Sequence, residues 1–106
     1  MEERGWKIFA PEEEEPGKDS EVFFNTEMLH NRDISEIAGK VFRKKIDPEI
    51  FTVCDPMAAS GIRGFRYSSI ADEVFINDTN PYAIKSIEKG LEKNNLEAKV
   101  SQKNAN

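Results

Sequence analysis

The sequence has little of what holds a small secreted domain together or anchors a chain in a membrane. Its 106 residues include one cysteine, Cys54, which excludes an internal disulfide and a cysteine-rich zinc site. No apolar run approaches the ~20 residues that a transmembrane helix needs. The first residues, 1–4, are mostly charged and no apolar stretch follows them, so no signal peptide is predicted. We therefore expect one small cytoplasmic domain with no membrane partner.

Positive charge is also scarce. The chain has 15 Lys and Arg against 20 Asp and Glu, a net charge of -5. Taken alone, this balance argues against nucleic-acid binding, because clustered Lys and Arg make the phosphate contacts. The excess is concentrated in Glu12 to Glu15, and one short basic cluster stands at Arg43 to Lys45. Runs of one sign are usually solvated surface, which is how both are interpreted.

Regular structure becomes predictable at Asp33. Asp33 and Glu36 have the spacing of a capping box, which satisfies free backbone donors where a helix starts. Apolar residues then recur at helical spacing. These residues are Ile34, Ile37, Ala38, Val41 and Phe42. The sequence thus predicts a helix that ends at Asp47-Pro48, after an irregular N-terminal segment over residues 1–33. Residues 34–106 would form the N-terminal half of a larger domain.

Strands and helices alternate from residue 50 onward. The predicted order is a strand at 50–54, a loop at 55–61, a helix at 62–69, a strand at 73–77, a helix from Asn80-Pro81 to about 94, and a strand at 98–102. Asn as a cap with Pro in the first helical position is a strong helix start. Alternation of this kind predicts an α/β fold, with a parallel sheet of about three strands. Cys54 is expected to be a buried apolar group in its strand.

Polar residues follow each predicted strand, where ligands bind in a doubly wound sheet. Asp55 follows the first strand and precedes a loop of small residues ending at Gly61, which lets a ligand approach the backbone. Asp78 follows the second strand, where a carboxylate can accept hydrogen bonds from ribose hydroxyls. The segment from Asn104 to Asn106 follows the third. Together these residues outline an adenosine pocket.

The sequence of the loop after the first strand indicates which class of adenosine cofactor the pocket would bind. It contains only Gly61 and Gly64, so it carries neither the dinucleotide fingerprint nor a P-loop. Asp55 followed by small residues suits a cationic amino-acid tail better than a pyrophosphate. S-adenosylmethionine fits that description.

Three segments carry a resemblance to a known family. They are Val22-Phe23-Phe24-Asn25 running on to Asn31-Arg32-Asp33-Ile34, Asp55-Pro56-Met57-Ala58-Ala59-Ser60-Gly61-Ile62-Arg63-Gly64, and Asn77-Asp78-Thr79-Asn80-Pro81. In this order they resemble the tRNA (guanine(26)-N2)-dimethyltransferase family. The resemblance implies a partial Rossmann-like fold of the class I S-adenosylmethionine-dependent methyltransferases. It also implies a parent enzyme that dimethylates the N2 amine of guanine 26 and binds tRNA through the full-length protein.

The resemblance also assigns roles to single residues. Arg32 and Arg63 match arginines that contact the cofactor, and a cation there would pair with the methionine carboxylate. Asp78 matches the ribose acceptor. Asn104 and Ala105 match the pair beside the adenine, where the family usually has an acidic residue.

The family's catalytic motif, Asp-Pro-Phe-Gly, does not occur in this sequence. We therefore expect no catalytic residue in the chain, and a chain that is inactive alone. In the family fold a fourth strand pairs beside the strand at 50–54, so we also expect an open sheet edge that associates with a second copy or another polypeptide. Two alternatives stay open. One is a non-enzymatic module that binds nucleotide or S-adenosylmethionine, or a partner subunit. The other is a methyltransferase of the same fold that acts on another RNA or on protein.

Overall fold

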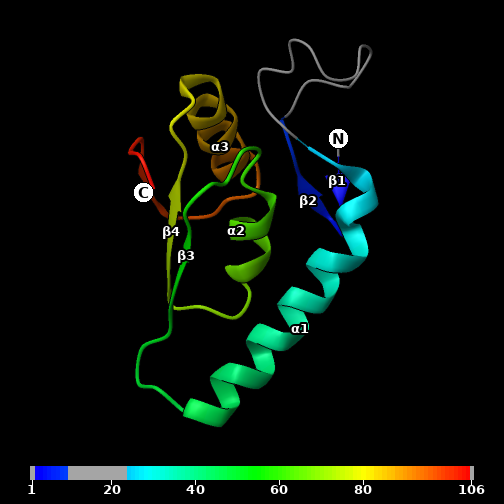
Figure 1. Cartoon of the computed structure of the whole chain (residues 1–106), viewed down its shortest axis with the longest axis vertical. Helices are drawn as coiled ribbons and strands as arrows, with labels where there is room; N and C mark the ends of the chain where they lie inside the picture. Colours follow the sequence, from blue (N-terminus) through cyan, green and yellow to red (C-terminus); the bar gives the residue numbers. More distant parts are fainter. Residues whose placement is uncertain (1, 10–23, 106) are drawn as a thin grey trace.

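A three-stranded parallel sheet with helices forms the body of the molecule (Figure 1). The structure is a computed structural model, which describes residues 2–9 and 24–105. The elements of the body are α1 (Leu29–Ile46), β3 (Thr52–Asp55), α2 (Ile62–Tyr67), β4 (Glu73–Asn77), α3 (Pro81–Lys93) and β5 (Lys99–Ser101). The sheet order is β3-β4-β5, and both pairings are parallel. The predicted α/β fold with a sheet of about three strands is confirmed.

Local sequence signals determine where β4 and α3 begin. β4 occupies the predicted residues 73–77, and α3 begins at Pro81. The Asn80 side chain caps α3 by accepting a hydrogen bond from the backbone N–H of Tyr82 at 3.0 Å. β3 lies one to two residues later than predicted, because Phe51 bonds through its backbone to the Asp72 side chain and to Glu73 instead of joining the ladder.

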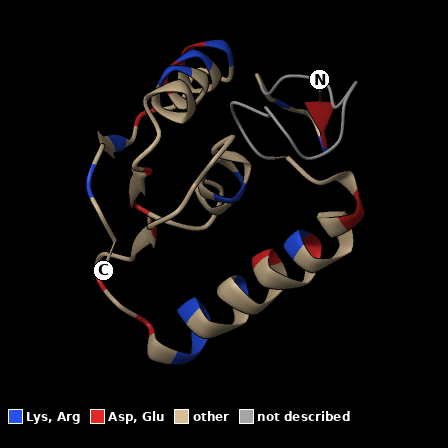
Figure 2. Cartoon of the chain, turned by 45° about the horizontal axis from the view of Figure 1, so that its top comes forward, with Lys and Arg blue, Asp and Glu red and all other residues tan. Residues whose placement is uncertain are grey.

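Helix α1 begins earlier than predicted. The side chain of Asn25 caps a 3-10 turn, η1 (Thr26–Met28), by accepting from Glu27 N at 2.9 Å, and α1 continues directly from that turn. The capping-box prediction at Asp33 is therefore wrong: Asp33 lies inside the helix and pairs with arginines. The division of the chain at residues 33 and 34 stays a prediction. The basic cluster at 43–45 does lie in the last turn of α1, where cations suit the helix dipole (Figure 2).

The core lies between α2, α3 and one face of β4. Phe65 of α2 is 1% exposed, and it packs with Ile76 of β4 and Ile87 of α3. Burying one large apolar side chain contributes roughly 1.5–3 kcal/mol. This cluster therefore fixes both helices on the same face of the sheet.

The opposite face of the sheet is much more open. Thr52 and Cys54 point to it from β3 and both are exposed, while Phe75 of β4 is half-buried. The prediction that Cys54 is buried is wrong, because α2 and α3 cover the other face of the sheet.

A short antiparallel hairpin precedes the body. Its strands are β1 (Glu2–Glu3) and β2 (Trp6–Lys7), within the segment predicted to be irregular. Ile8 follows β2 and is 1% exposed, packed with Phe24 and Ile62. The hairpin therefore belongs to the same folded unit as the sheet. The glutamate run at 12–15, with Val22 and Phe23, lies outside the described residues.

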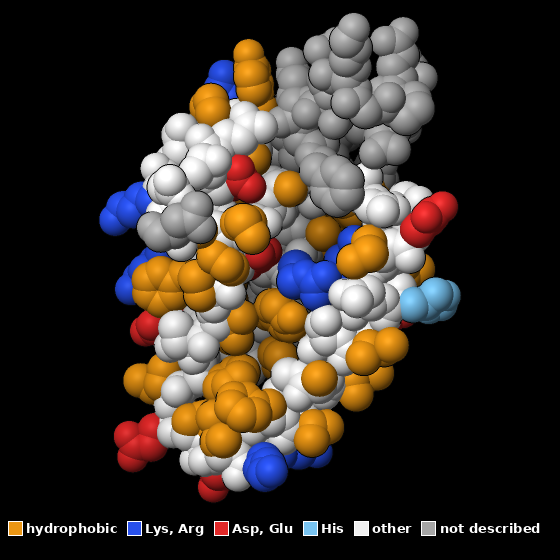
Figure 3. All heavy atoms as spheres, in the orientation of Figure 1, with side chains coloured by type: hydrophobic (Ala, Val, Ile, Leu, Met, Phe, Trp, Pro, Cys, Tyr) orange, Lys and Arg blue, Asp and Glu red, His pale blue; other side chains and the backbone are white. Residues whose placement is uncertain are grey.

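The apolar side chains of α1 face outward. Ile34, Ile37, Val41 and Phe42 are 67%, 60%, 60% and 54% exposed. Apolar side chains gather on the lower part of the face in Figure 3, beside α1. Across residues 2–9 and 24–105, no helix combines the length and apolarity that crossing a membrane requires.

Candidate functional site

The segments that follow the three parallel strands meet at one end of the sheet. The backbone N–H of Ala58, in the loop after β3, donates to the carbonyl of Asn77 at 2.8 Å. The backbone N–H of Asp78, just after β4, donates to the carbonyl of Ser101 at 3.2 Å. This is the end at which open α/β sheets bind ligands, so the fold brings the predicted strand-end residues together.

Asp55 ends β3 and is 6% exposed. Its Oδ2 accepts a hydrogen bond from the backbone N–H of Gly64 in α2 at 3.1 Å. Burial raises the pKa of the Asp55 carboxyl, whereas the Gly64 hydrogen bond and the charge of Arg63 act in the opposite direction. A buried carboxylate disfavoured in this way would gain from a cationic ligand.

Gly61 turns the chain from the loop into α2. Its φ of 87° lies in the left-handed region, which favours glycine. A Cβ at this position would stand 2.8 Å from Cζ of Phe65 and 3.2 Å from Cγ1 of Ile87. Both the backbone conformation and the close approach to the core therefore require glycine here.

Asp78 closes over the tip of the same loop. Its Oδ2 accepts from the backbone N–H of Ala59 at 2.8 Å, and its Oδ1 accepts from that of Asn80 at 2.9 Å. Ala59 has a φ of 50°, an uncommon conformation for alanine that costs of order 1–3 kcal/mol. The Asp78 carboxylate holds this strained residue and lies where the sequence analysis placed it.

The two predicted arginines approach from either side. Arg63 of α2 donates from Nη1 to Ser35 Oγ at 2.9 Å and from Nη2 to Asn31 Oδ1 at 3.1 Å, so it bridges to α1. Arg32 of α1 is 6% exposed, and its Nη2 donates to the carbonyl of Asn25 at 2.9 Å.

A carboxylate from the N-terminal hairpin already pairs with Arg32. Nε of Arg32 donates to Oε2 of Glu3 at 2.8 Å, and its Nη2 bonds to Oε1. Oε2 of Glu3 also accepts from Nη1 of Arg66 at 3.1 Å, and Arg66 bonds in turn to Asp33 and Glu36. With Arg4, which pairs with Asp33 at 2.8 Å, the cluster holds three cations and three carboxylates. It is balanced in charge and ties the hairpin to α1 and α2.

A cavity of about 150 Å³ lies between the loop after β3 and the N-terminal part of α1. It is lined by Phe24, Asn25, Met28, Arg32, Asp55, Met57, Ala58, Ala59, Ser60, Ile62 and Arg63. Three of the predicted site residues, Arg32, Asp55 and Arg63, therefore share one cavity. Asp78 adjoins it through its bond to Ala59. Asn104 and Ala105 do not line it and are exposed; Asn106 lies outside the described residues.

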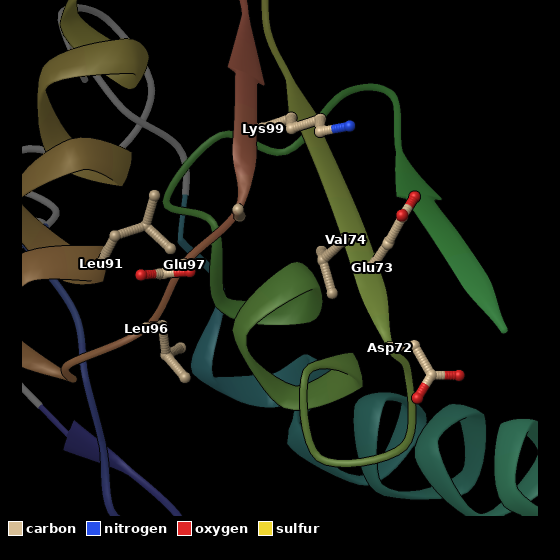
Figure 4. A pocket seen from close by; sticks show the side chains of 8 residues that line it. Asp72, Glu73, Val74, Leu91, Leu96, Glu97 and Lys99 are labelled. Carbon is tan, nitrogen blue, oxygen red and sulfur yellow. The ribbon is translucent and has the colours of Figure 1, made fainter. Parts of the chain in front are cut away.

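Two larger cavities among the described residues lie elsewhere. One of about 550 Å³ lies at the amino end of β4, between Asp72, Val74, Leu91 and Lys99 (Figure 4). Another of about 520 Å³ lies at the C-terminal end of α1, beside Ser69 and Ile70. Neither is at the carboxyl ends of the strands, so size does not mark the ligand site in this chain.

Sequence reasoning missed Glu3, Arg66 and Asn77. The partners of Glu3 are 29 and 63 residues away, and no local pattern announces such pairs. Asn77 stood inside a motif segment, but its position at the end of a strand gave no sign that its side chain joins three segments.

A parallel α/β sheet with carboxylates and arginines gathered where its strands end is typical of the class I methyltransferase fold. Residues 7–106 match the family model for N2,N2-dimethylguanosine tRNA methyltransferase, and the chain belongs to that family.

Similar proteins agree with this family. The tRNA (guanine(26)-N(2))-dimethyltransferase of Methanococcus maripaludis is 38% identical over 96 residues, which is 86% of this chain and 26% of that protein. The protein of the same description from Metallosphaera sedula is 42% identical over 90 residues, 82% of this chain and 22% of that protein. The chain thus spans about a quarter of the length of these relatives.

Solved structures share the fold. Trm1 from Pyrococcus horikoshii, in complex with S-adenosyl-L-methionine, is 32% identical with a TM-score of 0.64, covering 74% of this chain and 20% of that one. Trm5b from Pyrococcus abyssi, at 23% identity and a TM-score of 0.61, covers 78% of this chain and 24% of that one. The second supports the fold alone.

Proposed function

We propose that this chain is the cofactor-binding part of a cytoplasmic tRNA (guanine(26)-N2)-dimethyltransferase and that it binds S-adenosylmethionine. One observation carries the proposal: Arg32, Asp55 and Arg63 line one cavity, and the Asp78 carboxylate closes its loop. The two arginines match the carboxylate of that cofactor, Asp55 matches its ammonium, and Asp78 matches its ribose.

The charges of the cavity assign the methionine end of the cofactor. Its carboxylate would pair with Arg63, whose present partners, Ser35 and Asn31, are neutral. Its ammonium would lie toward Asp55, where a cation stabilises the buried carboxylate. The Nε–Nη2 edge of Arg32 already pairs with Glu3, so Arg63 would be the main partner of the cofactor carboxylate.

The adenosine end would lie outside the cavity, over the strand ends. A volume of about 150 Å³ is below the roughly 300 Å³ at which ligand pockets begin, so the cavity suits the amino-acid tail alone. Asp78 would accept from the ribose hydroxyls with the lone pairs that Ala59 and Asn80 leave unused. Gly61 keeps the loop close to the ligand, and Asn104 and Ala105 would flank the adenine.

In the parent enzyme the guanine N2 attacks the methyl carbon of the sulfonium, the carbon–sulfur bond breaks, and the amine loses a proton to a base. This chain would bind and orient the methyl donor for that attack. The base and most tRNA contacts would come from elsewhere in the full-length protein, and the chain alone would be inactive.

The open edge of β3 would be the partner surface. Among the described residues, β3 is one of the two outer strands of the sheet, and Ile50 beside it is 62% exposed. Apolar side chains of α1 are exposed to a similar degree. Unpaired strand edges with apolar surroundings invite association with another chain. The chain would therefore self-associate, or bind a second polypeptide that extends the sheet. Light scattering that finds a well-behaved monomer at micromolar concentration would contradict this.

Calorimetric titration with S-adenosylmethionine tests cofactor binding. Asp78→Ala and Arg63→Ala are each expected to weaken binding at least tenfold. Lys85→Ala, on the exposed side of α3, is the control and should bind like the parent. Adenosine, which lacks the amino-acid tail, should lose affinity with Asp78→Ala but not with Arg63→Ala. Unchanged affinity in both site variants would refute the assignment.

A further inference from the structure

The side chain of Asn77 joins its own strand, β4, to two other segments of the chain. Asn77 ends β4 and is 9% exposed. Its Nδ2 donates to the carbonyl of Pro56 at 2.9 Å and to that of Lys103 at 2.8 Å. Its Oδ1 accepts from Ser101 Oγ at 2.7 Å and from Lys103 N at 2.9 Å. A primary amide has two donors and two acceptor lone pairs, so all four positions are filled.

Two of the partners, Pro56 and Lys103, border parts of the proposed cofactor site. Pro56 opens the loop that lines the cavity, and Lys103 directly precedes Asn104 and Ala105. Asp78, the proposed ribose acceptor, follows Asn77 in the chain. The Asn77 amide therefore helps to set the spacing between the tail, ribose and adenine parts of the site, beside the backbone bonds from Ala58 to Asn77 and from Asp78 to Ser101.

We propose that Asn77 is the positioning residue of the adenosine half of this site. This inference rests on the proposed function and adds a residue to it. Because all its hydrogen-bonding positions are filled within the protein, Asn77 acts through the segments that it aligns and not by touching the ligand. Asp cannot replace it, because a carboxylate would face the Pro56 and Lys103 carbonyls with lone pairs only.

The chain offers a matched control in Asn94. Its Nδ2 also donates to two carbonyls, those of Lys7 and Gly90, both at 2.8 Å. Its Oδ1 accepts from Lys7 N at 2.7 Å. Asn94 lies at the C-terminal end of α3, the end opposite to the one that faces the site. Asn94→Asp thus removes the same chemistry without disturbing the strand ends.

The test compares Asn77→Asp and Asn94→Asp in the full 106-residue chain by calorimetry with S-adenosylmethionine and with adenosine. Asn77→Asp is expected to weaken both ligands about tenfold and by the same factor, because the loss lies in the adenosine half. Asn94→Asp should leave both affinities unchanged. Ser101→Ala removes only one of the four hydrogen bonds of the Asn77 side chain and is expected to weaken both ligands about threefold. This second variant keeps the test decisive if Asn77→Asp does not fold. Parent-like affinity in both Asn77→Asp and Ser101→Ala would overturn the inference.

Amide hydrogen exchange supplies a readout that does not need the ligand. In Asn77→Asp or Ser101→Ala the backbone N–H of Lys103 should exchange faster than in the parent, and in Asn94→Asp it should not. If the parent fails to bind S-adenosylmethionine, the proposed function falls, and the exchange of Lys103 alone then decides whether Asn77 aligns the segments. Unchanged exchange in both variants would overturn that role.

Discussion

Replacing Glu3 by Gln tests the charged cluster beneath the site. The Glu3 side chain is 5% exposed and lies between the guanidinium groups of Arg32 and Arg66, which are 6% and 5% exposed. Gln keeps the shape of Glu but removes the charge. Arg66 retains Asp33 and Glu36. Of its other contacts with described residues, Arg32 keeps the Asn25 carbonyl and its position 5.0 Å from the ring centre of Phe24.

The expected loss in the free energy of unfolding comes from the charge of Arg32, which stays buried without its carboxylate partner. Removing one partner of a buried ion pair costs about 3–5 kcal/mol, because the other charge stays buried without compensation. We expect the lower end, about 3 kcal/mol, since Gln can still accept one hydrogen bond from Arg32. In a domain of this size that loss lowers Tm by roughly 12–24 °C, at 4–8 °C per kcal/mol.

Urea unfolding followed by circular dichroism measures the effect. With a slope of about 1–3 kcal/mol per molar urea, the midpoint should fall by at least about 1 M. Glu2→Gln is the control, because Glu2 is the exposed neighbour in the same strand and should change stability by less than about 0.5 kcal/mol.

A second substitution separates loss of the charge pair from general damage. Arg32→Met in the Glu3→Gln background removes the unpaired charge and should recover much of the lost stability, because an apolar replacement of a buried pair is often near neutral. A cost below about 1 kcal/mol for Glu3→Gln, or a double variant as unstable as the sum of the two single variants, would refute the reasoning.

Three further predictions follow from single residues. Gly61→Ala should destabilise the chain by about 2–4 kcal/mol in the same urea assay, because φ is 87° and the added Cβ meets the Phe65 ring; a loss under about 1 kcal/mol would contradict the close packing. Asp55→Asn should stabilise the chain at neutral pH, on the order of 1 kcal/mol, yet weaken S-adenosylmethionine binding. Burial raises the pKa of Asp55 above its ordinary 3.8, so the folded chain holds the proton more tightly than the unfolded chain does. The stability of the parent therefore falls as the pH rises from 3.8 through the folded pKa, and Asp55→Asn should not show that fall. An Asp55→Asn chain that is no more stable than the parent would refute this. The pKa of Asp33 shifts in the opposite direction, because its hydrogen bonds from Arg4 and Arg66 lower it well below 3.8. The stability that the ionised Asp33 supplies is therefore present above pH 3.8 and is lost as the pH falls from 3.8 through the folded pKa. Asp33→Asn should flatten this acid loss when the urea midpoint is measured from pH 2 to 6, and an unchanged slope would count against the pairing.

The parts of the fold that local signals determine could be predicted from the sequence. β4 and the start of α3 follow from a β-branched run and from Asn80-Pro81, whose capping interactions act within three residues. The meeting of Asp55 and Asp78 followed from a rule of topology, since parallel strands end at the same edge. These inferences needed no knowledge of packing.

The parts that depend on distant partners could not be predicted. The sequence predicted Asp33 to be a helix cap because Glu36, three residues later, completes a local capping-box pattern. Its actual partners, Arg4 and Arg66, are 29 and 33 residues away. Cys54 looked buried because an apolar run does not reveal which face of a sheet stays open. The roles of Arg32, Arg63, Asn104 and Ala105 stay predictions until binding is measured.

The hairpin has a consequence for how this polypeptide acquires its shape during synthesis. Lys7 exchanges backbone hydrogen bonds with the side chain of Asn94, a contact that spans 87 residues. Translation adds about 5–20 residues per second, so the first strands wait on the order of 4–17 seconds before their docking partner exists. Glu3 gains Arg66, and Ile8 gains Ile62, before Asn94 is made; until then the carboxylate and the apolar side chain stay in water, and a chaperone that binds short apolar stretches would find its target there.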